Sequence, residues 1–399
     1  MRILHLCLGN FYIDNCSYQE NLLPKYHVLQ GHDVTVVASL FTYDENGKGT
    51  YLQRSSKYED KNGFIVVRLA YMKPIRWNRF FRHYKDLLKT IEEVNPDIIF
   101  SHNVSYGDTG VVRTYLRKHP DVKLFADNHA DYINSSKNIL SKYILHPIIW
   151  RHYVKKIEPY MTWCYGVTPL RCEFLIKEYR VNPAIVRYLP LGIDDELIPK
   201  DKESMRFSIR KEIGIKDDDF LIFTGGKIDR LKNTHYLIDA LSRINDSRIH
   251  LIVCGVLTPE MDYLKQKIET DANIHYMGWC DAERVMNCMV ASDLACFPGT
   301  HSTLWEQSVG VGLPAIFKKW DGMSQVNVNG NCVFVAGEDV EELKNAIVGM
   351  LFTEQYQNLR IKAKEASSFF LYSHIAQIAI DENFCLNNDI LNISYESES

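Results

Sequence analysis

Residues 297–317 read F-P-G-T-H-S-T-L-W-E-Q-S-V-G-V-G-L-P-A-I-F. A buried strand is predicted over residues 294–297, a polar loop over residues 300–303, and a helix over residues 303–311. The G-L-P that follows leads into a second strand at residues 315–317. A strand, a glycine-containing loop and a helix start, in that order, present backbone N–H groups to an anion. This stretch therefore predicts an anion site at the edge of an α/β sheet.

The same alternation extends over the whole chain in two series. The first has predicted strands at residues 3–8, 34–38, 64–69, 96–100, 123–126, 163–167 and 186–191. The second has strands at residues 220–224, 250–254, 274–277, 294–297 and 315–317, with helices at 236–244, 259–270, 282–291, 303–311 and 340–351. Strands that alternate with helices predict parallel sheets. We expect two Rossmann-like doubly wound domains facing a cleft, over residues 1–192 and 193–370, and a C-terminal helix and tail at 371–399 that packs toward the first domain.

The composition is that of a soluble globular protein, with 399 residues, 46% hydrophobic residues, 24% charged residues and a net charge of -4. This charge balance does not favour a nucleic-acid binder. The ten cysteines form no C-x-x-C pair, which indicates reduced thiols rather than a disulfide framework or a zinc site. Residues 1–8 are too short for a signal peptide, and no apolar run reaches the ~18 residues of a membrane span. We expect a cytoplasmic protein.

The second series opens with a glycine-rich basic loop, F-T-G-G-K-I-D-R-L-K-N at residues 223–233. Glycine allows close approach of the backbone, and the ammonium groups of Lys227 and Lys232 suit a diphosphate. The alternative is a solvated basic loop that binds nothing.

The order of these features resembles the nucleotide-binding half of GT-B glycosyltransferases, specifically the retaining family 4 type. Gly226, Lys227 and Lys232 stand at the positions of its G-[RK]-x-x-x-x-K element, which implies that both lysines contact the donor's phosphates and stabilise the leaving nucleoside diphosphate. P-L-G-I-D at residues 190–194 is similar to the P-N-G-[IV]-D of the family's domain boundary.

Two further strand ends carry the resemblance. V-C-G at residues 253–255 resembles the family's V-x-G, so Gly255 is expected near the donor. Residues 276–299 resemble its F-x-G-x-x-x-x-E element, which implies that Trp279 and Cys280, just after the glycine, lie near the base.

The opening stretch departs from the family's two-glutamate motif. The second glutamate's place holds Gln307, with Glu306 one residue earlier, and the first glutamate's place is Gly299 or Thr300. We expect Glu306 to hold the ribose hydroxyls, against the alternative of an exposed helix carboxylate. Adjacent helix positions differ by ~100°, so Glu306 and Gln307 point in different directions. The residues expected to bind sugar or phosphate are Thr300, His301, Ser302, Thr303 and Gln307.

In the first series, D-N-H-A-D at residues 127–131 follows a strand. The family has a histidine there near donor sugar and acceptor, which implies this role for His129, with His102 as a weaker second candidate and a merely structural histidine as the alternative. Gly9, Asn10, Tyr18 and Glu20 follow the first strand, where the family contacts acceptor and diphosphate.

Two basic stretches are rich in aromatic residues, at 71–89 and 137–156. Basic amphipathic helices with aromatic residues suit an anionic membrane surface. The alternative is a pair of helices with inward aromatics and solvated charges.

Together with these residues, the resemblance implies a retaining glycosyltransferase that is metal-independent and has no cofactor. Its expected donor is a nucleoside-diphosphate sugar, with UDP as the favoured nucleotide, and its expected acceptor is a glycan or a lipid-linked molecule. Three alternatives remain. They are a sugar-nucleotide epimerase of the same fold, a non-catalytic protein that binds a glycan or partner, and a dinucleotide-dependent enzyme. The last lacks support because no G-x-G-x-x-G follows the first strand.

Overall fold

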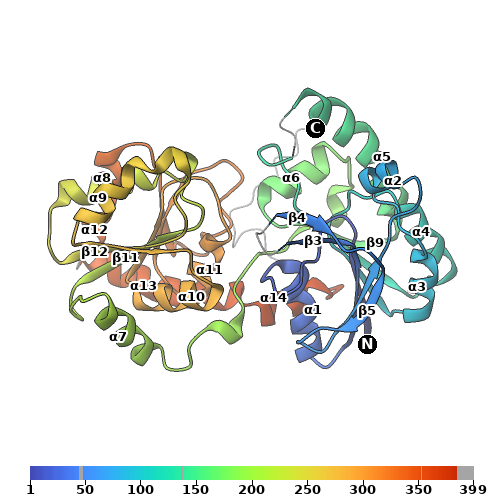
Figure 1. Cartoon of the computed structure of the whole chain (residues 1–399), viewed down its shortest axis with the longest axis horizontal. Helices are drawn as coiled ribbons and strands as arrows, with labels where there is room; N and C mark the ends of the chain where they lie inside the picture. Colours follow the sequence, from blue (N-terminus) through green and yellow to red (C-terminus); the bar gives the residue numbers. More distant parts are fainter. Residues whose placement is uncertain (45–47, 136–137, 352, 384–399) are drawn as a thin grey trace. The chain divides into compact units, whose positions relative to one another are not determined.

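The computed structural model describes residues 1–44, 48–135, 138–351 and 353–383 (Figure 1). The chain divides into two compact units. The first comprises Met1–Pro190 and the segment that begins at Ile375, and the second comprises Leu191–His374. Each unit is built around its own sheet.

The first unit contains an eight-stranded sheet in the order β10-β9-β8-β7-β1-β2-β6-β5. The strands are β1 (Arg2–Cys7), β2 (Asp33–Ser39), β5 (Ser56–Glu59), β6 (Ile65–Leu69), β7 (Ile98–Ser101), β8 (Lys123–Asn128), β9 (Met161–Gly166) and β10 (Val186–Tyr188). All neighbours run parallel except β5, which is antiparallel to β6. The short strands β3 (Phe41–Tyr43) and β4 (Gly49–Tyr51) form a separate antiparallel pair. The central strands β1 and β7 are almost wholly buried, as continuous apolar runs in parallel sheets are.

The helices of the first unit connect these strands. They are α1 (Gln19–Leu29), α2 (Ile75–Phe81), α3 (Leu87–Val94), α4 (Thr109–Lys118), α5 (Arg151–Ile157) and α6 (Pro169–Lys177), with a π-helix η1 (Ser141–Trp150) before α5. The last described helix, α14 (Tyr372–Ala379), ends in this unit.

The basic stretch 71–89 does not form the one amphipathic helix that its composition predicts. The helix α2 ends at Phe81 because Arg82 adopts a left-handed backbone conformation with φ 61°. Asp86 repeats this break with φ 58°, and α3 begins only at Leu87. The expectation of a single basic helix here is wrong, and two short helices take its place.

The second unit contains a six-stranded parallel sheet in the order β13-β12-β11-β14-β15-β16. Its strands are β11 (Phe220–Gly225), β12 (Ile249–Cys254), β13 (Ile274–Gly278), β14 (Leu294–Phe297), β15 (Ala315–Lys318) and β16 (Cys332–Val335). Its helices are α7 (Lys202–Glu212), α8 (Thr234–Ile244), α9 (Tyr263–Thr270), α10 (Ala282–Ala291), α11 (Leu304–Val311), α12 (Val340–Met350) and α13 (Glu354–Ala366). Figure 1 shows helices on both faces of this sheet, the arrangement predicted from the alternating pattern.

Three elements of this unit were not predicted from the sequence, namely β16, α7 and α13. Strand β16 has only four residues and joins the sheet beside β15. Helix α7 is mostly polar, and its Arg210 is buried against Asp293, with guanidinium nitrogen and carboxylate oxygen 3.3 Å apart. A tertiary ion pair of this kind leaves no periodic apolar signal in the sequence.

No described helix is long and apolar enough to cross a membrane.

Candidate functional site

Glycines bring the carboxyl ends of three neighbouring strands together in the second unit. Gly226 follows β11 with φ 101°, and its amide donates to Cys254 O at 2.8 Å. Gly255 follows β12 with φ 155°, and its amide donates to Gly278 O at 2.7 Å. A Cβ on Gly255 would lie 1.8 Å from Gly226 O, so no larger residue fits this arrangement. The carboxyl edge is where ligands bind in open parallel sheets.

Lys232 joins the basic loop to the loop after β14. Its ammonium donates to Thr300 O at 2.8 Å and to His301 O at 3.1 Å. The backbones meet as well, because Thr300 N donates to Leu231 O at 2.9 Å. Burial lowers the pKa of the Lys232 ammonium. An ammonium has three N–H donors, so one remains for a further acceptor beyond these two carbonyls.

The carboxylate of Glu306 is fully buried, with 0% of the side chain exposed. Its Oε1 lies 2.8 Å from His301 Nε2 and accepts a hydrogen bond from Gln325 Nε2 at 2.9 Å. The alternative of an exposed helix carboxylate is therefore wrong. Only the His301 ring of this group reaches the surface, with 11% of its side chain exposed. The geometry makes Glu306 the residue that orients His301.

The start of α11 is already partly capped by its own loop. Leu304 N donates to Ser302 Oγ at 3.2 Å, and Trp305 N donates to Ser302 O at 2.9 Å. These two amides are not unsatisfied donors as the sequence pattern suggested. The cationic contribution at this edge comes instead from Lys232 and the neighbouring Lys227.

The other predicted residues of the second unit lie at or near its surface. Lys227 and Thr303 are exposed, Gln307 is half-buried, and Trp279 is 77% exposed. Cys280 is half-buried, with its thiol directed to the carbonyl of Gly278 at 3.7 Å.

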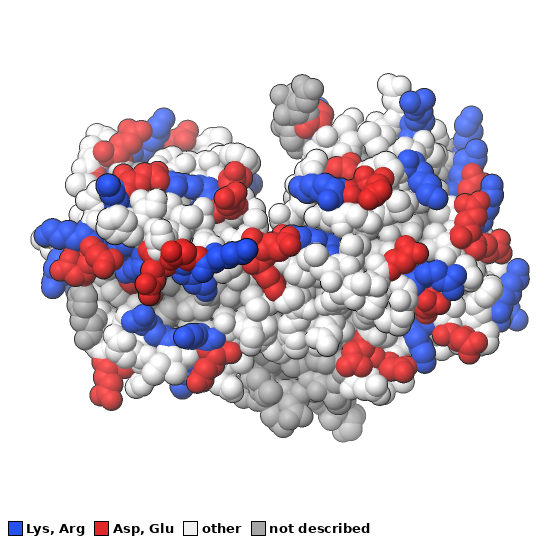
Figure 2. Space-filling model, turned by 90° about the horizontal axis from the view of Figure 1, so that it is seen from below, with Lys and Arg blue, Asp and Glu red and all other residues white. Residues whose placement is uncertain are grey.

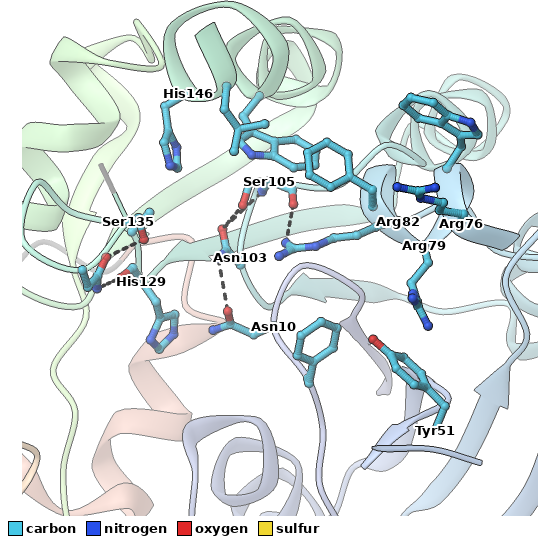
Figure 3. A pocket seen from close by; sticks show the side chains of 17 residues that line it. Asn10, Tyr51, Arg76, Arg79, Arg82, Asn103, Ser105, His129, Ser135 and His146 are labelled. Atoms are coloured by element: carbon cyan, nitrogen blue, oxygen red, sulfur yellow. Dashed lines mark hydrogen bonds between the residues drawn. The ribbon is translucent and has the colours of Figure 1, made fainter. Parts of the chain in front are cut away.

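The first unit contains a cavity of about 920 Å³ at the carboxyl end of its sheet. Two of the predicted residues, Asn10 and His129, line it. Asn10 Oδ1 accepts a hydrogen bond from Asn103 Nδ2 at 3.1 Å, and Figure 3 shows the two amides side by side in the wall. Gly9 packs beneath them, since a Cβ there would lie 2.7 Å from Asn103 O. Tyr18, which is exposed, and Glu20, which is buried, do not line this cavity.

Asp127 stands between two histidines, one of which, His129, lines this cavity. Its Oδ2 lies 3.6 Å from His129 Nε2 and 3.4 Å from His102 Nδ1, and its Oδ1 accepts from Asn103 N at 2.6 Å. Burial alone would raise the pKa of Asp127, but His129 and His102 outweigh burial and hold this pKa below its ordinary value. Asp127 was not predicted as a functional residue, although it shares the D-N-H-A-D segment with His129.

A line of buried histidines leads from Asp127 to the C-terminal helix. His102 Nε2 lies 3.0 Å from His5 Nδ1, and His5 Nε2 lies 2.9 Å from His27 Nδ1. His27 Nε2 donates to the carbonyl of Ala376 in α14 at 2.8 Å. All three side chains are 0% exposed. Burial lowers the pKa of His5, and burial lowers the pKa of His27 to about 3.

The two ends of this line determine where its protons lie. A carbonyl only accepts, so His27 must carry its proton on Nε2, and each neutral ring then passes the donor role to the next. A neutral His102 would turn the lone pair of Nδ1 toward the carboxylate of Asp127 at 3.4 Å. The line therefore joins α14 to the Asp127 carboxylate through an unbroken series of short contacts between polar atoms.

Charges are mixed on the outer surface that Figure 2 displays, where Lys and Arg are interspersed with Asp and Glu. The cavity of the first unit differs, because its lining includes Arg76, Arg79 and Arg82 and no Asp or Glu. Within the described ranges, no three or more His, Cys, Asp or Glu side chains are grouped to hold a metal ion. None of the nine described cysteines is in a disulfide.

Two units of this kind, each with a mainly parallel sheet between helices, match the GT-B fold, and comparison with solved structures agrees. Sucrose-phosphate synthase from Thermosynechococcus elongatus superposes with a TM-score of 0.62 at 16% identity, covering 94% of this chain and 96% of that one. HepE of Anabaena, solved in complex with UDP, superposes with a TM-score of 0.65 at 16% identity, covering 94% and 98%.

The family follows from sequence profiles. The profile of "Glycosyltransferase Family 4" matches residues 23–197, and that of "Glycosyl transferases group 1" matches residues 205–366. The chain belongs to this family of glycosyltransferases. Among characterised proteins it is similar to mannosylfructose-phosphate synthase of Agrobacterium fabrum, at 22% identity over 230 residues. That alignment covers 53% of this chain and 50% of the relative, so the chain spans about half of the relative's length.

Proposed function

We propose that this glycosyltransferase moves a sugar from a UDP-linked donor to a glycan or lipid-linked acceptor, with retention of anomeric configuration and without a metal ion, as in the synthesis of surface polysaccharides. The observation that carries the proposal is the Lys232 ammonium, held by two carbonyls beside the glycine edge of the second sheet. A fixed cation there is suited to a diphosphate. The name of the HepE structure supports UDP as the nucleotide.

In this reaction the bond between the sugar's anomeric carbon and the diphosphate oxygen breaks while a bond to the acceptor oxygen forms. The acceptor hydroxyl attacks from the face that the diphosphate leaves, and its proton passes to the departing phosphate oxygen. Lys232 and Lys227 neutralise the charge that develops on that oxygen. His301, oriented by Glu306, contacts sugar or phosphate. Glu306 therefore acts on the ribose only indirectly, through His301. His129 contacts the transferred sugar or the acceptor.

Transfer and donor hydrolysis measured with UDP-, GDP- and ADP-sugars test this proposal, with the anomeric configuration of the product read by NMR. The wild type is expected to release UDP and to give a retained product, and Lys232→Ala to lower turnover about a hundredfold, the range seen for loss of one charge-stabilising donor. The proposal is contradicted if the protein neither binds nor turns over any of these donors. A sugar-nucleotide epimerase would instead convert the donor into an epimeric sugar nucleotide without an acceptor.

Membrane association is a second part of the proposal, and exposed apolar side chains support it. In α2, Ile75, Trp77 and Phe80 are all more than half exposed, next to the exposed Arg76 and Arg79. A second exposed apolar group comprises Ile139, Leu140, Tyr143, Ile144 and Ile148. Apolar side chains interleaved with cations are suited to an anionic bilayer surface.

Co-sedimentation with liposomes tests the membrane part. Binding to vesicles with an anionic lipid fraction should weaken in high salt and should fall in the double variant Trp77→Ser/Phe80→Ser. Equal recovery with neutral and anionic vesicles at any salt concentration contradicts it.

A further inference from the structure

The cavity of the first unit is lined by three arginines and by no carboxylate. Arg76, Arg79 and Arg82 line it together with His129 and His146, and no Asp or Glu is among the lining residues. In the described ranges none of the three arginines forms an ion pair with a carboxylate. Arg82 is partly buried, and a partly buried cation without a counter-charge is unfavourable in a folded protein, so the cavity is suited to an anionic ligand.

Arg82 is the most constrained of the three. One terminal nitrogen, Nη1, donates to Gly9 O at 2.5 Å and to Ser105 O at 2.6 Å. The guanidinium carbon lies 5.6 Å from the ring centre of Phe11 and 5.5 Å from that of Trp150. Burial lowers the pKa of this guanidinium. Carbonyls and ring faces fix the group in place but carry no net charge, so its positive charge is preorganised for a ligand.

Arg79 and Arg76 extend the same charge along α2. The guanidinium carbon of Arg79 lies 4.7 Å from the ring centre of Tyr51, which holds the side chain at the cavity. Figure 3 shows the three arginines on one side of the cavity and Asn10, Asn103 and Ser135 on the other. One wall is cationic, and the opposite wall presents amides and hydroxyls of the kind that bind sugar hydroxyls.

We propose that this cavity binds an acceptor that carries a phosphate group, with Arg76, Arg79 and Arg82 on the phosphate and the amide wall on the sugar or its hydroxyls. Guanidinium groups bind phosphate through paired N–H donors, and three of them match a dianion better than a single carboxylate. A cavity of about 920 Å³ has room for such a molecule. The inference rests on the proposed function, because it names the class of acceptor for the same transfer.

Two sources share this chemistry, a soluble sugar phosphate and a lipid-linked phosphate. Calorimetric titrations with glucose 6-phosphate, with glucose and with a polyprenyl monophosphate in detergent micelles separate them. We expect a phosphate-bearing probe to bind the wild type and glucose to bind at least tenfold more weakly. The probe with the higher affinity identifies the source.

Arg79→Gln and Arg76→Gln are the test variants, because both residues are exposed and neither is needed for the fold. Each should weaken binding of the phosphate probe about tenfold, the effect of one charged hydrogen bond. Arg117→Gln on α4, an exposed arginine outside the cavity, is the matched control and should bind like the wild type.

The proposal is overturned if no phosphate-bearing probe binds, or if the Arg79 and Arg76 variants bind it as tightly as the control. Titration of the same samples with UDP keeps this outcome separate from the proposed function. UDP binding without phosphate-probe binding removes the phosphorylated acceptor but leaves the glycosyltransferase proposal intact. If the phosphate probe binds the wild type and binds Arg79→Gln more weakly, while UDP does not bind, the phosphate site in the cavity is supported. The proposed UDP-linked donor is then contradicted.

Discussion

His27 makes the stability of the first unit depend on pH in a defined window. Its pKa falls from 6.5 to about 3 because burial disfavours the charged ring. Below pH 6.5 the unfolded chain binds a proton at His27 while the folded protein does not, so stability is lost as the pH falls toward 3. One pH unit in this window corresponds to about 1.4 kcal/mol, so the 1.5 units between pH 6.5 and 5 remove about 2 kcal/mol.

The perturbation is His27→Gln, which keeps one donor and one acceptor but no titrating group. The variant should start less stable by about 1–3 kcal/mol, because its contacts with His5 and Ala376 are imperfect. Its further loss between pH 6.5 and 5 should be about 2 kcal/mol smaller than that of the wild type. His5 still titrates, so some pH dependence remains.

Urea unfolding followed by tryptophan fluorescence at several pH values measures this difference. His152→Gln, a change of an exposed histidine, is the control and should keep the wild-type pH dependence. The reasoning is refuted if His27→Gln and His152→Gln lose the same free energy of unfolding between pH 6.5 and 5.

Two further substitutions test the second unit. Gly255→Ala should abolish the cooperative thermal transition of this unit, since the new Cβ would lie 1.8 Å from Gly226 O. Gly214→Ala, at φ 74° with open space around it, is the control and should cost only about 1 kcal/mol. Equal melting temperatures of the two variants would contradict this. Asp293→Asn should lower the free energy of unfolding by about 3 kcal/mol, because it removes the nearer carboxylate of the buried Arg210 and leaves only Asp217 at 3.9 Å. A urea midpoint equal to the wild type would be inconsistent with that ion pair.

The sequence predicted most strands of both sheets, the basic loop after β11 and an anion site in the loop after β14. Those predictions rest on local signals, namely alternating apolar runs, glycines at strand ends and the paired lysines Lys227 and Lys232. The resemblance to the family added the donor class, and the matching profiles confirm that the chain is a glycosyltransferase.

Contacts between distant segments could not be predicted in this way. Gln325 reaches Glu306 from a loop with no recognisable pattern, and the histidine line joins residues from β1, α1 and the loop after β7. Arg82 was assigned to a basic helix, but its left-handed backbone ends α2 and turns the side chain into the cavity. Such features depend on tertiary packing, which single-residue propensities do not encode.

The central claim is that Lys232 holds the diphosphate of the donor, and calorimetric titration with UDP tests it most directly. The wild type and Lys211→Met, a change of an exposed lysine on α7, should bind UDP with similar Kd. Lys232→Met should raise that Kd at least tenfold, because one charged hydrogen bond to phosphate is lost. A Kd for Lys232→Met equal to that of Lys211→Met would contradict the account.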